Sequence, residues 1–135
     1  MKPSDGPSLP ARNDRFKWYA FMPAVLWLIV ITYLSTMPGV SLPAFNLIAT
    51  DKLAHAGVYG VQTWLVLYGI GKAWGRAGTG FAYGASAFAI ATAYGVLMEF
   101  VQFWFFPGRF YEYDDMLANA IGAGIGWALF RLWRK

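Results

Sequence analysis

The stretch DKLAHAGVYGVQTWLVLYGI, residues 51–70, decides the fold of this chain. It opens with Asp51, Lys52 and His55, and apart from these residues the segment up to Ile70 is mainly apolar. Its length approaches the ~20 residues that a helix needs to cross the hydrocarbon core of a bilayer. Ionisable side chains in or near hydrocarbon are costly, so they commonly mark a site. The stretch therefore predicts a membrane helix with a polar, functional end.

Three more apolar segments accompany it. Hydrophobic residues make up 58% of the 135 residues and charged residues only 13%, whereas a soluble domain has about 25% charged residues. We expect an all-α, polytopic membrane protein with four transmembrane helices in a compact bundle, at about 18–36, 52–70, 80–106 and 115–133. These helices form one domain, 16–135, after a Pro- and Ser-rich, disordered cytoplasmic N-terminus, 1–15. The first apolar run exceeds the roughly 7–15 residues of a signal-peptide core, so we expect this helix to be retained.

The distribution of charge predicts the orientation of these helices. Four crossings place both termini on one side, and that side carries nine of the 11 basic residues. The positive-inside rule therefore places both termini in the cytoplasm. Five of the seven acids fall on the opposite, outer side. Because the basic residues form no single patch, we expect no nucleic-acid partner. The chain has no cysteine, which excludes disulfides and thiolate chemistry.

The chain shows signs of an internal duplication. Sliding it by 64 residues aligns the motif that starts at Asp51 with the motif that starts at Asp115, and His55 with Asn119. The two helical hairpins would run in the same direction, which permits a parallel repeat about an axis along the membrane normal. Such an axis would bring the two Asp-initiated helices together at the outer face.

The polar residues of the second and fourth helices allow two interpretations each. Asp51 and Asp115 directly precede apolar runs, so either could cap a helix N-terminus, and helix N-termini can also bind anions. Lys52, His55 and Tyr59 share one face of a helix. That face could merely pack inward, or His55 could carry a proton or bind phosphate near neutral pH.

The third helix carries the most informative single residue, Glu99, about 10 Å from the outer end of the helix. A carboxylate at this depth needs a proton or a cationic partner, such as Lys52 or Arg109. A buried ion pair that only fixes the bundle is the structural alternative. The planar guanidinium of Arg109 suits phosphate or carboxylate, and Asn119 can orient a neighbour. Ala118, Gly122 and Gly126 form a small-residue face for close helix packing.

These residues form a pattern: Asp51-Lys-x-x-His55-x-x-x-Tyr59, Glu99-x-x-Gln102-x4-Pro107-Gly-Arg109 and Asp115-x-x-x-Asn119-x-x-Gly122. The pattern, from about Ser35 to Gly126, resembles the VanZ-like family, which is named for a bacterial protein associated with resistance to the glycopeptide teicoplanin. The resemblance implies a small, multi-helix protein of the bacterial inner membrane. It supplies no settled mechanism. The bulky, acidic stretch after Arg109 departs from the family's pattern and leaves the specificity of that loop open.

Chemistry and resemblance together favour a polar pocket at the outer leaflet that binds an anionic or glycosylated envelope lipid or glycopeptide. The positions that match the family's pattern are the expected ligand-binding residues: Ser35, Asp51, Lys52, His55, Tyr59, Glu99, Gln102, Arg109, Asp115 and Asn119. The alternative is an intramembrane hydrolase or transferase that acts on a lipid headgroup, with His55, Glu99 and Asp115 as catalytic candidates. A structural or partner-binding subunit is a third interpretation. A histidine with two carboxylates could also supply three ligands to a hard or borderline metal ion, but we assign no cofactor and no metal from the sequence.

Overall fold

A computed structural model describes residues 17–37, 47–75 and 80–135 of the chain. Within these ranges every regular element is helical: η1 (Trp18–Phe21), α1 (Met22–Thr36), α2 (Leu47–Trp74), α3 (Phe81–Phe105) and α4 (Tyr113–Trp133). The prediction of an all-α protein with four helices is confirmed. The predicted disordered segment 1–15 lies outside the described residues.

The bounds of α1, α2 and α4 differ by more than one residue from the expected ones, and the largest difference is at α2, which also extends to Trp74 instead of residue 70. Helix α2 begins at Leu47 instead of residue 52, so Asp51 lies inside the helix and does not cap it. The residues before Asp51 are themselves largely apolar and compatible with a helix, so the acidic residue marks no boundary. Helix α4 begins at Tyr113, and Asp115 lies in its first turn. There Asp115 lies near the positive end of the helix dipole, which stabilises a carboxylate.

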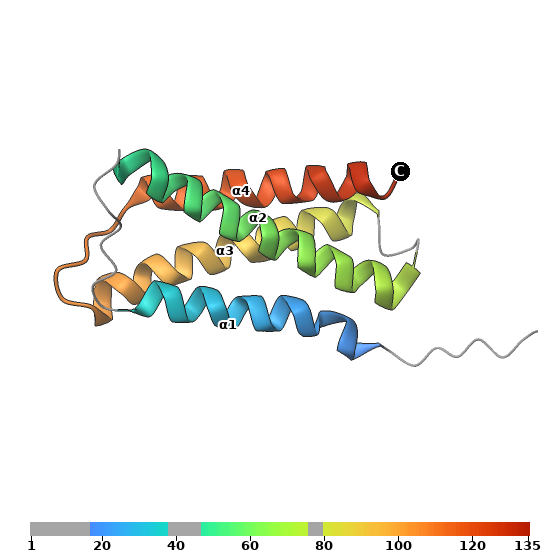
Figure 1. Cartoon of the computed structure of the whole chain (residues 1–135), viewed down its shortest axis with the longest axis horizontal. Coiled ribbons are helices and arrows are strands. Elements are labelled where there is room, and N and C mark those ends of the chain that lie inside the picture. The colour runs from blue at the N-terminus through green and yellow to red at the C-terminus, as the bar shows by residue number, and fades with distance from the viewer. Residues whose placement is uncertain (1–16, 38–46, 76–79) are drawn as a thin grey trace, which may run out of the picture.

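The helices lie along one long axis, and α2 and α4 run side by side in the same direction (Figure 1). Glycines bring these two helices into close contact. A Cβ atom at Gly122 would collide with the carbonyl oxygen of Ala56, and one at Gly126 would collide with the carbonyl oxygen of Gly60. The predicted small-residue packing face on α4 is therefore confirmed, and it sets α2 and α4 backbone against backbone.

The two outer helices are not placed alike. Helix α3 packs against both α2 and α4, whereas α1 packs mainly on α2. A parallel central pair is what the predicted two-hairpin repeat requires, but a repeat would also give α1 and α3 equivalent positions. The unequal packing of the outer helices counts against the repeat.

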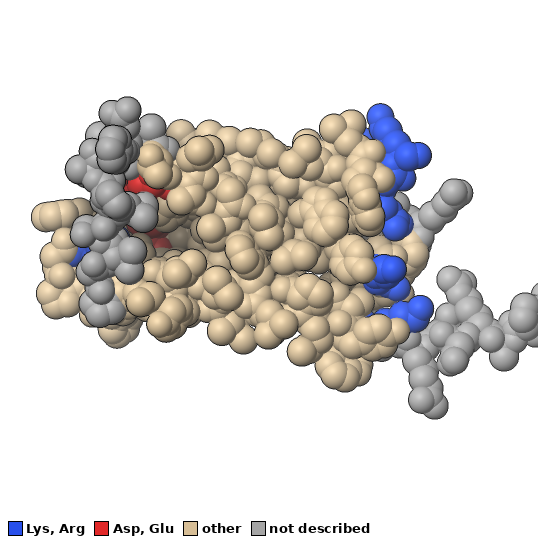
Figure 2. Space-filling view, in the orientation of Figure 1, with Lys and Arg blue, Asp and Glu red and all other residues tan. Residues whose placement is uncertain are grey.

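Polar and apolar side chains are distributed as in a protein that is surrounded by lipid. Gln62, Thr63 and Asn119 are buried, whereas one face of α4 exposes a row of large apolar residues: Leu117, Ile121, Ile125, Leu129 and Leu132. In the space-filling view, an uncharged belt separates most of the visible Lys and Arg atoms at one end from the Asp and Glu atoms at the other, where a smaller basic patch also lies (Figure 2). Two helices, Trp18–Thr36 and Phe81–Phe105, are long and apolar enough to cross a membrane.

Candidate functional site

A cavity of about 220 Å³ lies at the end of the bundle that carries the acidic residues. Six of the predicted site residues line it: Ser35, Asp51, His55, Tyr59, Gln102 and Arg109. They come from α1, from three successive turns of α2, from the end of α3 and from the loop that follows α3. The other four predicted residues lie behind this lining: Lys52, Glu99, Asp115 and Asn119. Lys52 belongs to α2 and contacts α4, Glu99 belongs to α3, and Asp115 and Asn119 belong to α4.

Lys52 turns away from the cavity and joins α2 to α4. Its Nζ atom lies 3.2 Å from Oδ1 of Asp115 and 3.5 Å from Oδ2 of Asp114. Asp115 is only 5% exposed, whereas Asp114 is exposed. Removing a carboxylate from solvent is costly unless a cation and hydrogen bonds compensate it. The lysine therefore serves as the counter-ion of the buried acid on the neighbouring helix.

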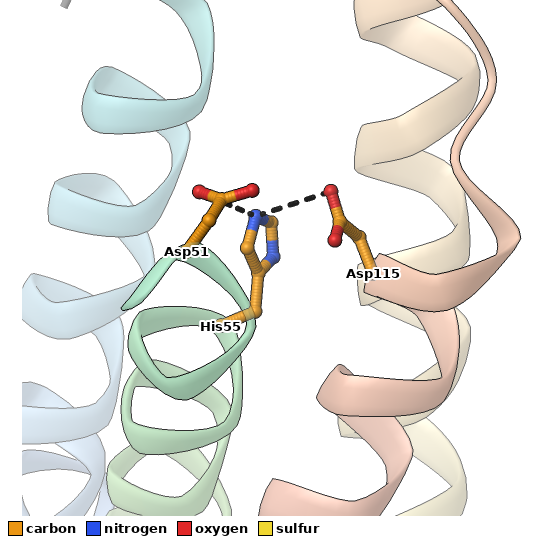
Figure 3. Close-up of side chains that lie close together, drawn as sticks. All are labelled: Asp51, His55 and Asp115. Atoms are coloured by element: carbon orange, nitrogen blue, oxygen red, sulfur yellow. Dashed lines mark ion pairs between the residues drawn. The ribbon is translucent and has the colours of Figure 1, made fainter. Parts of the chain in front are cut away.

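His55 lies between two carboxylates from different helices (Figure 3). Its Nε2 atom is 3.6 Å from Oδ2 of Asp115 on α4 and 4.0 Å from Oδ1 of Asp51, one turn earlier on α2. Its other ring nitrogen, Nδ1, is 3.0 Å from Oδ1 of Asn119. Because an amide oxygen only accepts hydrogen bonds, Nδ1 is the donor in this contact. In the neutral ring Nε2 then carries the lone pair and faces the two acids.

The packing around Asn119 fixes the orientation of this imidazole. Asn119 is 1% exposed, and a Cβ atom at Gly95 of α3 would approach its Nδ2 atom to 2.8 Å. The absence of a side chain at Gly95 therefore makes room for the amide between α3 and α2. Helices α3 and α4 together hold the group that selects the tautomer of His55.

Glu99 is 3% exposed and lies on α3 behind the cavity. The carboxylate of Glu99 lies within electrostatic reach of Asp115 and His55 and near the backbone of Glu112. Lys52 pairs with Asp115 and Asp114 instead, so the lysine partner that the sequence suggested for Glu99 is not formed. The side chain of Glu112 lies outside the helices; partial desolvation and then the carboxylates of Asp115 and Asp51 raise its pKa above the ordinary value.

Three polar residues of the cavity lining lie outside α2: Gln102, Ser35 and Arg109. Gln102 donates a hydrogen bond of 2.8 Å from Nε2 to the backbone carbonyl of Ser35, which joins α3 to the end of α1. Gly108, with φ of 86°, turns the chain after α3 in the left-handed region that favours glycine. Arg109 follows directly, is exposed, and lines the cavity. The turn therefore brings one guanidinium to the edge of a partly apolar cavity.

Sequence reasoning missed the apolar part of the lining, which consists of Ile31, Leu34, Met37, Ala54 and Val58. Helical spacing contained a signal for two of them, because Ala54 and Val58 flank His55 on the same side of α2. The spacing of Ile31, Leu34 and Ser35 would likewise place them on one face of α1. The cavity thus combines a hydrocarbon wall with charged and hydrogen-bonding groups.

The model of the VanZ/LLP1 family matches residues 15–134 of the chain. The protein therefore belongs to the VanZ/LLP1 family. The family and the two apolar helices together indicate a membrane protein. No curated protein and no solved structure matches the chain.

Proposed function

We propose that this chain is a bacterial inner-membrane protein that binds an anionic or glycosylated lipid or glycopeptide of the cell envelope in the cavity beside Arg109. The observation that carries the proposal is the mixed lining of this cavity. Arg109 offers positive charge and hydrogen-bond donors to an anionic headgroup, while Ile31, Leu34 and Val58 offer an apolar surface to an acyl chain. An amphiphile matches both parts.

The proposal includes four membrane crossings with both termini in the cytoplasm, so that the cavity opens at the outer leaflet. Helices α2 and α4 carry more charge than the two apolar helices, but Lys52 and His55 of α2 face Asp115 and Asn119 of α4. Large apolar residues of both helices are exposed, among them Leu53, Ile121 and Ile125. The basic residues gather at the end opposite the cavity (Figure 2), which agrees with the positive-inside rule.

Native mass spectrometry of the protein extracted in mild detergent tests ligand binding. We expect an adduct with the mass of an envelope lipid on the wild type and its loss in Arg109→Ala, because Arg109 is the guanidinium that lines the cavity. Arg131→Ala is the matched control, since it removes the same group from the opposite end of the bundle. Equal adducts on all three proteins, or none on the wild type, would refute the proposal.

An intramembrane enzyme that acts on a lipid headgroup is the second candidate. The orientation of His55 favours it, because Nε2 is presented beside the Asp115 carboxylate while Asn119 holds the other ring nitrogen. A histidine held in one tautomer can act as a general base. If the protein is an enzyme, the wild type should release a headgroup fragment from its bound lipid during incubation. The variant His55→Gln should instead keep an adduct with the mass of the intact lipid. Identical lipid masses and no fragment would exclude turnover.

A further inference from the structure

Asp51, His55 and Asp115 converge on one point between α2 and α4 (Figure 3). Each offers one ligand atom, and these atoms all lie within 4.8 Å of one another. Two of them come from adjacent turns of α2 and the third from the first turn of α4. The close contact of Gly122 and Gly126 with α2 fixes the distance between the two helices. The three donors are thus held in place by the fold, with no contribution from a loop.

The separations between these atoms suit a shared cation better than direct hydrogen bonds. Nε2 of His55 lies 3.6 Å and 4.0 Å from the two carboxylate oxygens, beyond the roughly 2.7–3.2 Å of an N–H···O hydrogen bond. Nitrogen and oxygen ligands bind Zn²⁺ at about 2.0–2.2 Å, which places two ligands of one ion about 3–4 Å apart. The two separations from Nε2 lie in that range, and the two carboxylate oxygens lie within 4.8 Å of each other.

The hydrogen bond between His55 and Asn119 points independently to a metal. Metal-binding histidines donate their second ring N–H to an oxygen, which fixes the tautomer and aims the other nitrogen at the ion. Asn119 accepts such a bond from Nδ1 at 3.0 Å and is itself almost completely buried. Nε2 then faces two carboxylates, and a cation bound between these three groups would offset the charge of both acids.

The surroundings leave room for an ion and for a further ligand. Lys52 binds Oδ1 of Asp115, while Oδ2 faces His55. Asp51 and His55 line the cavity, so a coordination position beyond the three protein ligands would open toward it. We propose that Asp51, His55 and Asp115 bind one divalent transition-metal ion, with Zn²⁺ as the best match to one imidazole and two carboxylates. This site depends only on the protein and not on the identity of the cavity's ligand.

Zinc titration by calorimetry tests the site. The full chain is purified in detergent with a tag that contains no histidine, stripped of metal, and titrated with ZnCl₂ in the absence of added lipid. We expect one ion per chain, and at least about tenfold weaker binding for Asp51→Asn. Asp114→Asn is the matched control, because it removes the same charge beside Asp115 from a residue outside the three ligands; its affinity should stay within about twofold of the wild type.

Nitrogen NMR identifies the ligand atom without ambiguity, because the chain contains a single histidine. In protein labelled with ¹⁵N-histidine, Zn²⁺ should shift the Nε2 resonance of His55 strongly and leave Nδ1 protonated. An unchanged Nε2 resonance at saturating zinc, or equal loss of affinity in Asp51→Asn and Asp114→Asn, would overturn the proposal. A lipid adduct without zinc binding would refute the metal site and leave the proposed lipid site standing. Zinc binding without a lipid adduct would support the metal site and refute the proposed lipid site.

Discussion

The two ends of the bundle use the same kinds of side chain in opposite ways. At the basic end, Nζ of Lys72 lies 5.5 Å from the centre of the Tyr68 ring, and the guanidinium carbon of Arg134 lies 6.0 Å from the centre of the Phe130 ring. At the cavity end, Lys52 and His55 turn inward toward the acid of a neighbouring helix. At the basic end these residues lie beside aromatic rings, whereas at the cavity end they pair with acids and join neighbouring helices.

The basic end therefore indicates how the protein is oriented in the membrane, whereas the cavity end indicates where its chemistry lies. A lysine or arginine at the edge of the apolar belt can keep its charge in water while its stem covers apolar surface, so the basic end needs no specific partner. A carboxylate as buried as Asp115 pays a desolvation cost that only a cation and hydrogen bonds offset. Groups retained at such a cost are the stronger indication of function, which is why the candidate site lies at the cavity end.

Cysteine labelling of intact cells provides the sharpest test of the comparison, because the native chain contains no cysteine. Asp114→Cys places a thiol at an exposed position at the cavity end, and Lys135→Cys places one at the basic end. We expect a membrane-impermeant maleimide to label the first variant in intact cells and the second only after lysis, as the proposed orientation requires. Labelling of Lys135→Cys in intact cells would reverse the proposed topology.

Separating the central helices should disrupt the cavity end most strongly. In Gly122→Ala the new methyl group meets the backbone of Ala56, so we expect a loss of about 1–3 kcal/mol in the free energy of unfolding. Gly57→Ala is the matched control, because its Cβ atom meets nothing within 4 Å and alanine favours a helix by up to about 1 kcal/mol. Denaturation in detergent measures both; equal stabilities would contradict close packing of α2 and α4.

Removing the amide that holds His55 should have an intermediate effect. Asn119→Ala leaves Nδ1 of His55 without its buried acceptor, and we expect a loss of about 1–2 kcal/mol in the free energy of unfolding. The ¹⁵N spectrum of the single histidine should then report a mixture of tautomers where the wild type has one. A spectrum identical to that of the wild type would show that Asn119 does not select the tautomer.

The smallest effect is expected at the basic end. Arg134→Ala removes a guanidinium beside the Phe130 ring, and an exposed contact of this kind contributes at most about 1 kcal/mol. The melting temperature in detergent should therefore change less than in Asn119→Ala. A larger loss than in Asn119→Ala would mean that the basic end also contains a specific network.

The sequence by itself determined the class of fold and the end of the molecule at which to look. Apolar segments of membrane-spanning length predicted four helices, and three of the four lie within a few residues of the expected bounds. The uneven distribution of basic residues predicted one basic and one acidic end, which the surface has (Figure 2). Local physics suffices here, because helix formation and charge placement depend on neighbours along the chain.

Only the tertiary structure decided which polar groups meet. Helical spacing placed Lys52 and His55 on one face of α2, but their partners Asp115 and Asn119 are 63 and 64 residues away. The tertiary structure also decided which predicted residues line the cavity and which, such as Glu99, lie behind the lining. A periodic pattern shows on which face of its own helix a side chain lies. It does not show how the neighbouring helix is rotated about its axis or shifted along it. The rotation and the shift were set by the glycines at which α4 contacts the backbone of α2.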